Sequence, residues 1–187
     1  MHIWYGENEL KETSVARRYA KAFTQKYNEP ALLDTMSAQL KEFAEVFDRA
    51  KILRAVLLHP AVDPEEKQSA LKEIARALNA SEQTAEVLSH LLKKGRLPLV
   101  KLVAGEFEKI SNNILGRVRV EVTTAALISD SDRKILADKL TAVSGKEAVI
   151  EHKVDPSLVG GIVARIGSVI YDGSIKNQLK ALRAGIE

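Results

Sequence analysis

The sequence predicts a mainly α-helical protein with a small α/β part. We expect a six-helix antiparallel bundle over residues 1–115, followed by an α/β domain with a hairpin over residues 116–187. Three observations lead to this prediction. In the first range, apolar residues recur every three or four positions, the period of an amphipathic helix. From Arg117 onward the period falls to two, which is typical of a strand. Further along, Gly167-Ser168 separates two short apolar runs, as a hairpin turn does.

The first three helices follow from caps and prolines. Thr13 or Ser14 can cap the first helix, because a hydroxyl accepts a hydrogen bond from a free N–H of the first turn. The second follows Pro30 and carries an apolar stripe. A short third helix must end before Pro60, since a residue ahead of proline avoids the α region. The stripe of the second helix is Leu33, Met36, Leu40, Phe43 and Phe47.

The next three helices have clearer boundaries. Asp63-Pro64 is a start signal for the fourth, because aspartate caps and proline lacks only an N–H that would be unpaired there. Ser81 starts the fifth, and Gly95 ends it. The sixth is predicted from about Leu97 to Leu115. Each helix is amphipathic, so packing their apolar stripes together predicts the bundle.

The second range alternates strands and helices. The segment 117–123 places three valines on one face of a strand and charged residues on the other. Ser129 or Asp130 caps a helix that Gly145 ends, and Ala148 opens another strand. The stripe expected to be buried on this helix is Ile135, Leu136, Leu140 and Val143.

A hairpin and a last helix complete the second range. Residues 162–166 and 169–171 form the hairpin, with a type II′ turn at Gly167-Ser168. Asp172-Gly173-Ser174 then leads into the last helix. One face of that helix carries Ile175, Leu179, Leu182 and Ile186, and the other carries Lys176, Lys180 and Arg183.

Composition excludes several classes of protein. The chain of 187 residues is 45% hydrophobic and 28% charged, which is the balance of an ordinary soluble globular protein. It has no cysteine, so it has neither disulfides nor thiolate sites. Its apolar runs are far shorter than the ~20 residues of a membrane helix, and the N-terminus has no basic segment followed by an apolar core. We therefore expect a cytosolic, bacterial-type location without direct membrane insertion.

Charge does not indicate a nucleic-acid arm. The formal net charge is +3, with basic and acidic residues interleaved. The small cluster Lys93-Lys94-Gly95-Arg96 lies at a predicted helix C-terminus, where the helix dipole alone favours cations. A basic helical-bundle adaptor that binds nucleic acid remains the alternative hypothesis.

No motif predicts catalysis, a cofactor or a metal. The histidines are scattered, and Ser144-Gly145-Lys146 fails as a phosphate loop because Leu140 and Glu147 stand where the motif needs glycine and a hydroxyl residue. Gly160-Gly161 precedes a strand rather than a helix, so we expect a tight turn or close backbone packing there and no phosphate cradle. We interpret the chain as a non-enzymatic interaction protein.

Several stretches resemble one family in order along the chain. They are residues 16–23 (ARRYAKAF), 57–60 (LLHP), 91–97 (LLKKGRL), 122–125 (VTTA) and, most specifically, 154–167 (VDPSLVGGIVARIG) with 172–174 (DGS). Over roughly residues 14–184 the chain resembles the delta subunit of bacterial F-type ATP synthases. The mitochondrial relative in this family is the oligomycin-sensitivity-conferring protein.

The resemblance implies a stator role in ATP synthesis and proton transport. It implies that residues 1–115 sit on the catalytic head and hold N-terminal helices of the alpha subunits. It implies that residues 116–187 join the peripheral stalk of b subunits, with one copy of the chain per complex at the cytoplasmic face of the bacterial plasma membrane. The protein would do no chemistry itself and would resist the torque of the rotor.

Candidate partner-binding residues lie on three helices. A partner helix can lay its apolar face in a groove between two helices of a bundle. The first and fifth helices have apolar faces wide enough for both core and partner; the alternative is that all of these residues are core. The basic face of the last helix suits an acidic or mixed-charge stalk helix, and a solvated face is the alternative there. The candidates are Val15, Tyr19, Phe23, Val87, Leu88, Leu91, Lys176, Lys180 and Arg183.

Overall fold

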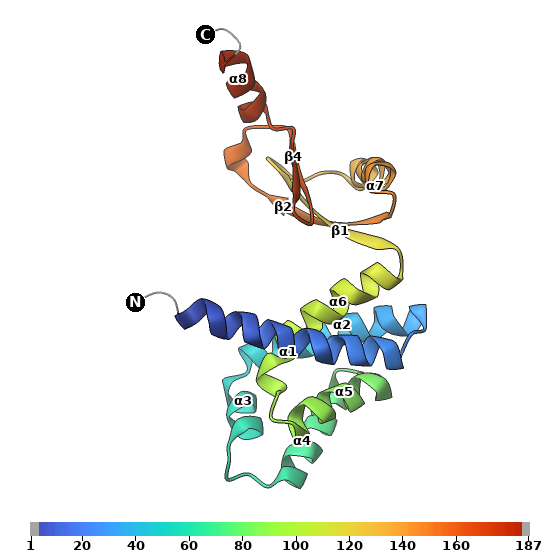
Figure 1. The fold of residues 1–187 in the computed structure, drawn as a ribbon, viewed down its shortest axis with the longest axis vertical. Coiled ribbons are helices and arrows are strands. Elements are labelled where there is room, and N and C mark those ends of the chain that lie inside the picture. Colours follow the sequence, from blue (N-terminus) through green and yellow to red (C-terminus); the bar gives the residue numbers. More distant parts are fainter. Residues whose placement is uncertain (1–3, 185–187) are drawn as a thin grey trace. The chain divides into compact units, whose positions relative to one another are not determined.

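The computed structural model describes the backbone of residues 4–184 and the side chains of residues 10–179 (Figure 1). Its internal contacts divide the chain into two compact units, one ending at Ser111 and one beginning at Asn112. We call them the N-terminal and C-terminal units. The division falls in the last turns of a helix, a few residues before the boundary expected at residue 115. At a coarse level the fold is mainly helical with a small mixed sheet, as predicted.

The N-terminal unit is built from helices that start largely where the sequence predicts. Asp63 accepts a hydrogen bond from the Glu65 N–H at 2.8 Å, and the Ser81 hydroxyl accepts one from the Thr84 N–H at 3.3 Å. Both start signals are therefore confirmed. The elements are α1 (Trp4–Lys26), α2 (Pro30–Arg49), α3 (Lys51–Leu58), α4 (Pro64–Ala77), α5 (Glu82–Lys93), the 3-10 turn η1 (Leu97–Leu99) and α6 (Val100–Ile114).

Two predicted helix boundaries are wrong. Helix α1 begins at Trp4, so Thr13 and Ser14 lie inside it and do not cap it. The preceding residues include good helix formers such as Glu9 and Leu10, which let the helix extend beyond the capping signal. The predicted sixth helix also begins later, because Pro98 lies in a 3-10 turn that precedes α6.

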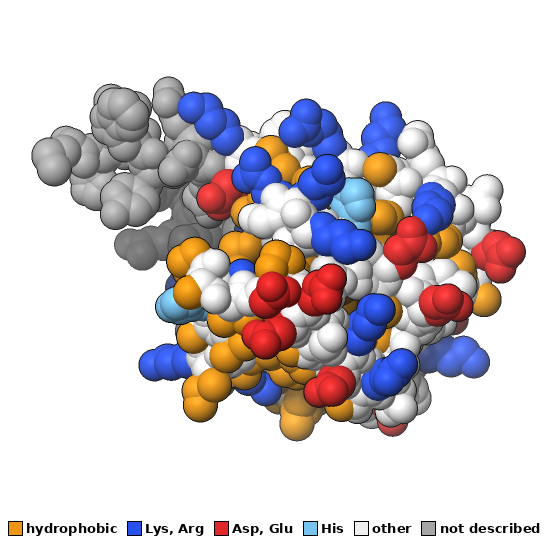
Figure 2. Space-filling model, turned by 90° about the horizontal axis from the view of Figure 1, so that it is seen from below, with side chains coloured by type: hydrophobic (Ala, Val, Ile, Leu, Met, Phe, Trp, Pro, Cys, Tyr) orange, Lys and Arg blue, Asp and Glu red, His pale blue; other side chains and the backbone are white. Residues whose placement is uncertain are grey.

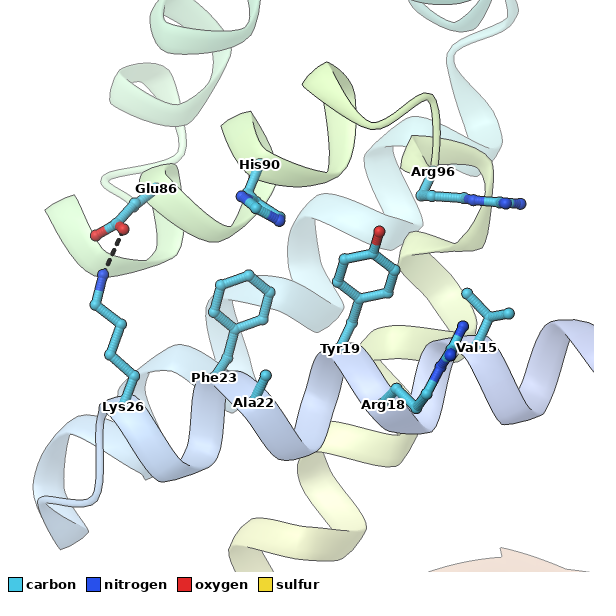
Figure 3. Close-up of a pocket in the computed structure, with 9 residues that line it drawn as sticks. All are labelled: Val15, Arg18, Tyr19, Ala22, Phe23, Lys26, Glu86, His90 and Arg96. Carbon is cyan, nitrogen blue, oxygen red and sulfur yellow. Dashed lines mark hydrogen bonds and ion pairs between the residues drawn. The ribbon is translucent and has the colours of Figure 1, made fainter.

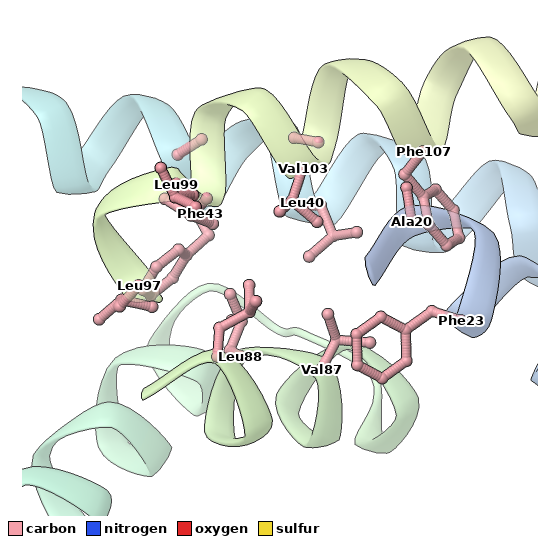
Figure 4. Packing of buried hydrophobic residues seen from close by; sticks show 14 of the residues in the cluster. Ala20, Phe23, Leu40, Phe43, Val87, Leu88, Leu97, Leu99, Val103 and Phe107 are labelled. Carbon is pink, nitrogen blue, oxygen red and sulfur yellow. The ribbon is translucent and has the colours of Figure 1, made fainter. Parts of the chain in front are cut away.

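One apolar core holds the N-terminal unit together (Figure 4). The whole predicted stripe of α2 is buried in it. Helix α1 contributes Ala16 and Ala20, both 0% exposed, whose small side chains let its backbone approach the core closely. Phe43 and Phe107 are among the largest fully buried side chains. Figure 4 shows residues from α1, α2, α5, η1 and α6 converging there.

The C-terminal unit contains a four-stranded sheet in the order β2-β1-β3-β4. Strands β1 and β2 are parallel, and the other neighbours are antiparallel. A parallel pair needs a crossover connection, which α7 provides. The elements are β1 (Arg117–Thr124), α7 (Asp130–Ser144), β2 (Glu147–Val154), the 3-10 turn η2 (Pro156–Leu158), β3 (Ile162–Ile166), β4 (Val169–Asp172) and α8 (Ile175–Ala184).

Strand β1 shows the predicted alternation. Val120 and Val122 are 0% exposed, whereas Arg117 on the other face pairs with Glu147 of β2 at 3.0 Å. The stripe predicted for α7 is only half correct: Leu140 is buried, but Ile135 and Val143 are 54% and 62% exposed. Helix α7 packs mainly on β2, which is an edge strand of the sheet, and the flank of that stripe is left exposed.

The glycine-rich segment before β3 is explained by close backbone packing. A Cβ on Gly161, whose φ is +82°, would lie 2.4 Å from the carbonyl oxygen of Gly173. The Gly173 N–H donates to the Ile162 carbonyl at 2.9 Å, and the Ile175 N–H donates to the Gly160 carbonyl at 3.1 Å. The glycines therefore let two backbone segments meet where α8 begins, as the close-packing interpretation predicts.

The turns on either side of β3 have positive φ angles. Val159 has φ +63° and ψ −37°, and the Gly160 N–H donates to the Leu158 carbonyl at 2.7 Å across it. This is a γ-turn of the rare positive-φ kind, which is strained for a β-branched residue. In the hairpin turn Gly167 has φ +60° while Ser168 is not in the positive-φ region, the combination predicted for type II′.

Candidate functional site: a groove between helices α1 and α5

A groove with a volume of about 520 Å³ lies between α1 and α5 in the N-terminal unit (Figure 3). We call it the α1–α5 groove. Its α1 wall repeats at the spacing of one helix face, and its other wall comes from α5 and the loop after it. It is lined by Val15, Arg18, Tyr19, Ala22, Phe23, Lys26, Glu86, His90 and Arg96.

Helix α1 divides its surface between the core and the groove. Ala16 and Ala20 point to the core, and Val15 and Tyr19, one position away from them, are half-buried and line the groove. Phe23 is 8% exposed and contributes to both. The three candidate residues on α1 are therefore brought together along one wall.

Helix α5 presents different residues from those the sequence predicts. Val87, Leu88 and Leu91 are each 0% exposed and belong to the core, which is the alternative that the sequence analysis left open for them. The apolar stripe of α5 therefore packs entirely against the other helices of the N-terminal unit. The exposed residues of α5 that line the groove are Glu86 and His90.

Aromatic rings form the floor of the groove. The rings of Tyr19 and Phe23 stack with centroids 6.5 Å apart. The His90 ring stands edge-on to both, at 6.0 Å from Tyr19 and 5.8 Å from Phe23. Such pairs contribute roughly 0.5–1.5 kcal/mol each beyond the burial of area. These ring contacts hold the floor in place, and Figure 3 shows the side chains of Tyr19, Phe23 and His90 near one another.

An ion pair closes one end of the groove. Glu86 accepts a hydrogen bond from the Lys26 ammonium at 2.5 Å and another from the Tyr27 hydroxyl. These hydrogen bonds, the one from Lys26 first, lower the pKa of Glu86 below its ordinary value. Burial, and then the hydrogen bond to Glu86, raise the pKa of Tyr27. Glu86 is thus a charged carboxylate that already has its partners.

Two arginines border the other end. Arg18 rises from α1 beside Val15, and Arg96 follows the C-terminus of α5 (Figure 3). Both are exposed. Figure 2 shows one face of the molecule, on which basic and acidic side chains are interspersed with apolar ones. The groove therefore combines an apolar floor with an excess of positive charge.

The candidate residues of the last helix belong to the other unit. Lys176 on α8 is exposed, as are the neighbouring Ile175 and Leu179. Hydrogen bonds with Ser157, and to a smaller extent the charge of Lys176, lower the pKa of Asp155. The side chains of Lys180, Leu182 and Arg183, and the whole of Ile186, lie outside the described residues.

Arg18, Lys26, Glu86, His90 and Arg96 were not predicted as site residues. On α5 the sequence pattern shows only the apolar stripe, and the residues of that stripe belong to the core. A sequence signal for the groove does exist, because Glu86 and His90 are four residues apart and so share one face of α5.

The described residues show no sign of a metal centre or of a membrane span. Among residues whose side chains the structure describes, no three His, Asp or Glu residues cluster as metal ligands would. The described helices include none with both the length and the apolar character needed to cross a bilayer.

Comparison with known proteins identifies relatives over nearly the whole chain. A family model described as "ATP synthase delta (OSCP) subunit" matches residues 15–186. The ATP synthase subunit delta of Desulforamulus reducens is 37% identical over 171 residues, which cover 91% of this chain and 94% of that protein. That of Trichlorobacter lovleyi is 35% identical over 166 residues, covering 89% and 92%.

A solved structure has a similar fold. A chain in the cryo-EM structure of the Toxoplasma gondii mitochondrial ATP synthase hexamer matches with a TM-score of 0.64. The match covers 91% of this chain and 96% of that chain at 17% sequence identity, so it concerns the fold. It spans both units of the present structure.

Proposed function

The chain belongs to the ATP synthase delta (OSCP) family, and from this premise we propose that its α1–α5 groove binds an N-terminal helix of an alpha subunit. As a member of this family it is a non-catalytic subunit of the stator, which links the catalytic head to the peripheral stalk and resists the torque of the rotor. In this proposal, residues 1–115 act as a six-helix bundle that makes the connection to the catalytic head.

The observation that carries the proposal is the accessible apolar surface along the α1 wall of the groove. Val15, Tyr19 and Ala22 are accessible between two helices, where a partner helix can insert the apolar side chains of one face. The α1 wall from Val15 to Lys26 is about 17 Å long at ~1.5 Å per residue, or about three turns of a docked helix. A preformed floor also lowers the cost of ordering on binding, which favours a long-lived connection.

The proposal is tested by blocking the groove without disturbing the core. Ala22 is exposed and lines the groove, so Ala22→Arg fills it with a long charged side chain. We expect calorimetry with the full chain to show at least about tenfold weaker binding of a peptide from the alpha N-terminus. Ala38→Arg, at an exposed alanine of α2 outside the groove, is the control and should bind normally. Equal binding by both variants would contradict the proposal.

We further propose that the C-terminal unit contacts the b subunits of the peripheral stalk through α8. Lys176, Ile175 and Leu179 are exposed on this helix, so a basic and an apolar face are both available to a stalk helix. The helical spacing in the sequence predicts that the basic face also includes Lys180 and Arg183. Lys176→Glu should weaken co-purification with a soluble b-subunit fragment, whereas Lys146→Glu, an exposed lysine after α7, should not. Loss with both variants, or with neither, would remove the assignment to α8.

We also propose that one copy of the chain per complex lies at the cytoplasmic face of the bacterial plasma membrane, held there through its partners. Washing membranes with a low-salt, chelating buffer should release it together with the head subunits. Recovery only after detergent would contradict peripheral attachment.

A further inference from the structure

The two ends of the α1–α5 groove differ in charge. At one end the Lys26 ammonium is neutralised by Glu86, 2.5 Å away. At the other end stand Arg18 and Arg96, with no carboxylate among the residues that line the groove there (Figure 3). The groove therefore has one neutral end and one positive end.

The two arginines have no internal partner in the described part of the chain. Among the described side chains, no ion pair or hydrogen bond joins either guanidinium to another side chain. The contrast with a neighbour is direct, because Arg17, one residue earlier on α1, pairs with Glu106 at 2.7 Å. Arg17 thus serves the fold, whereas Arg18 and Arg96 keep their hydrogen-bond donors available to a ligand.

Because the arginines lie beside apolar side chains, their interaction with a bound anion becomes stronger. Val15 and Tyr19 adjoin them in the groove, so a helix docked there would exclude water from one side of the guanidinium groups. A charge pair gains strength as the surrounding dielectric falls. Guanidinium groups also match a carboxylate in geometry, since they can donate two parallel hydrogen bonds to it.

We propose that Arg18 and Arg96 form a cationic clasp for a carboxylate side chain that flanks the apolar face of the docked helix. This inference rests on the proposed function of the groove and adds that the bound helix must carry an acidic residue beside its apolar face. Because only one end is positive, a helix with its acidic residue near one terminus meets the clasp in one direction only. The clasp therefore determines the direction of the helix in the groove as well as part of its affinity.

The test uses the full chain and a synthetic alpha N-terminal peptide. Arg18→Gln and Arg96→Gln remove charge and keep much of the side-chain length. We expect each to weaken binding about three- to tenfold, and the double variant to reduce the salt dependence of the affinity. Arg76→Gln, at an exposed arginine in the last turn of α4, is the matched control and should change affinity by less than about twofold.

A second set of peptides identifies the carboxylate. Each Glu or Asp of the peptide is replaced in turn by Gln or Asn. At the residue held by the clasp, the replacement should weaken binding of the unmodified protein but have little further effect on the Arg96→Gln variant, because the two changes remove the same interaction.

The outcomes separate this inference from the function on which it rests. If the native peptide binds and Ala22→Arg abolishes binding, but the arginine variants bind normally, the clasp is wrong and the groove assignment stands. Additive effects of every peptide and protein change would also overturn the clasp. If the native peptide does not bind at all, both proposals fail.

Discussion

Glu106 illustrates how a single buried charge joins two helices. Its side chain is 6% exposed, and its carboxylate accepts hydrogen bonds from Arg17 of α1 and Lys109 of α6, both at 2.7 Å. Burial raises the pKa of Glu106, but the hydrogen bonds from Arg17 and Lys109 outweigh it, so that the pKa lies below its ordinary value. The folded state therefore favours the charged carboxylate.

The first prediction concerns this carboxylate. A group whose pKa is lower in the folded protein stabilises it above the unfolded pKa, about 4.3 for glutamate, and that stabilisation is lost as the pH falls through the folded pKa. Glu106→Gln should lower the free energy of unfolding by about 1–2 kcal/mol at pH 7, because charge-assisted hydrogen bonds are lost. Urea titration should show the difference from wild type shrinking below about pH 4.5. Glu73→Gln, on the exposed side of α4, is the control; a difference that does not depend on pH would contradict the prediction.

At the scale of elements, the junction between η2, β3 and α8 depends on backbone contact. Gly161 lies against the backbone of Gly173 and Ser174, with gaps too small for a side chain. Gly167, in the hairpin turn, also has a positive φ, but no atom lies within 4 Å of where its Cβ would be. Alanine at Gly167 would add only the cost of a left-handed backbone conformation, whereas alanine at Gly161 would add a steric clash as well.

The second prediction uses this pair. Gly167→Ala should cost only about 1 kcal/mol for placing a side chain in the left-handed region. Gly161→Ala should cost clearly more, about 2–4 kcal/mol, because the backbone at the start of α8 must also move. Hydrogen exchange of the amides of Gly173 and Ile175, which bond across the junction, reports the local effect. Equal losses from the two variants would show that the close contact does not matter.

At the scale of the whole molecule, the two units have separate cores of unequal size. Among the described side chains, the core of the C-terminal unit has five buried apolar residues and the core of the N-terminal unit has twenty. The five are Val120, Val122, Leu140, Ala148 and Ala164. A small core leaves less apolar area buried to offset chain entropy. We therefore expect the C-terminal unit to be the less stable of the two.

The third prediction tests this difference. Val120→Ala should destabilise the C-terminal unit by about 2 kcal/mol and accelerate hydrogen exchange there, with the N-terminal unit unchanged. Leu88→Ala, in the core of the N-terminal unit, should destabilise that unit and leave hydrogen exchange in the C-terminal unit unchanged. A single cooperative transition that both variants shift equally would show that the chain unfolds as one unit.

Much of the local structure was predictable because its causes are local. Asp63, Ser81 and Ser129 start helices through hydrogen bonds to residues two or three positions away. The alternation of β1 and the glycine at the hairpin turn are equally short-range. The start of α1 was missed because a capping hydroxyl permits a helix start without requiring one.

The groove was predictable only in part. The sequence indicates that α1 and α5 are amphipathic, and Val15, Tyr19 and Phe23 do line the groove. It does not indicate how much of each stripe the core uses. Val87, Leu88 and Leu91 are buried in the core, whereas Ile135 and Val143 of α7 remain exposed beside the edge strand β2.

The sequence by itself determined the types of element, their order and the family, because caps, periodicity and the glycine-bearing segment are written in residues close together along the chain. The tertiary structure alone decided where the α1–α5 groove lies. The ring contact between Phe23 and His90 joins residues that are distant in sequence. The charged residues at the two ends of the groove likewise come from two separate parts of the chain. Whether a side chain faces the core, a groove or solvent depends on which helix packs beside it, and that is a property of the whole fold.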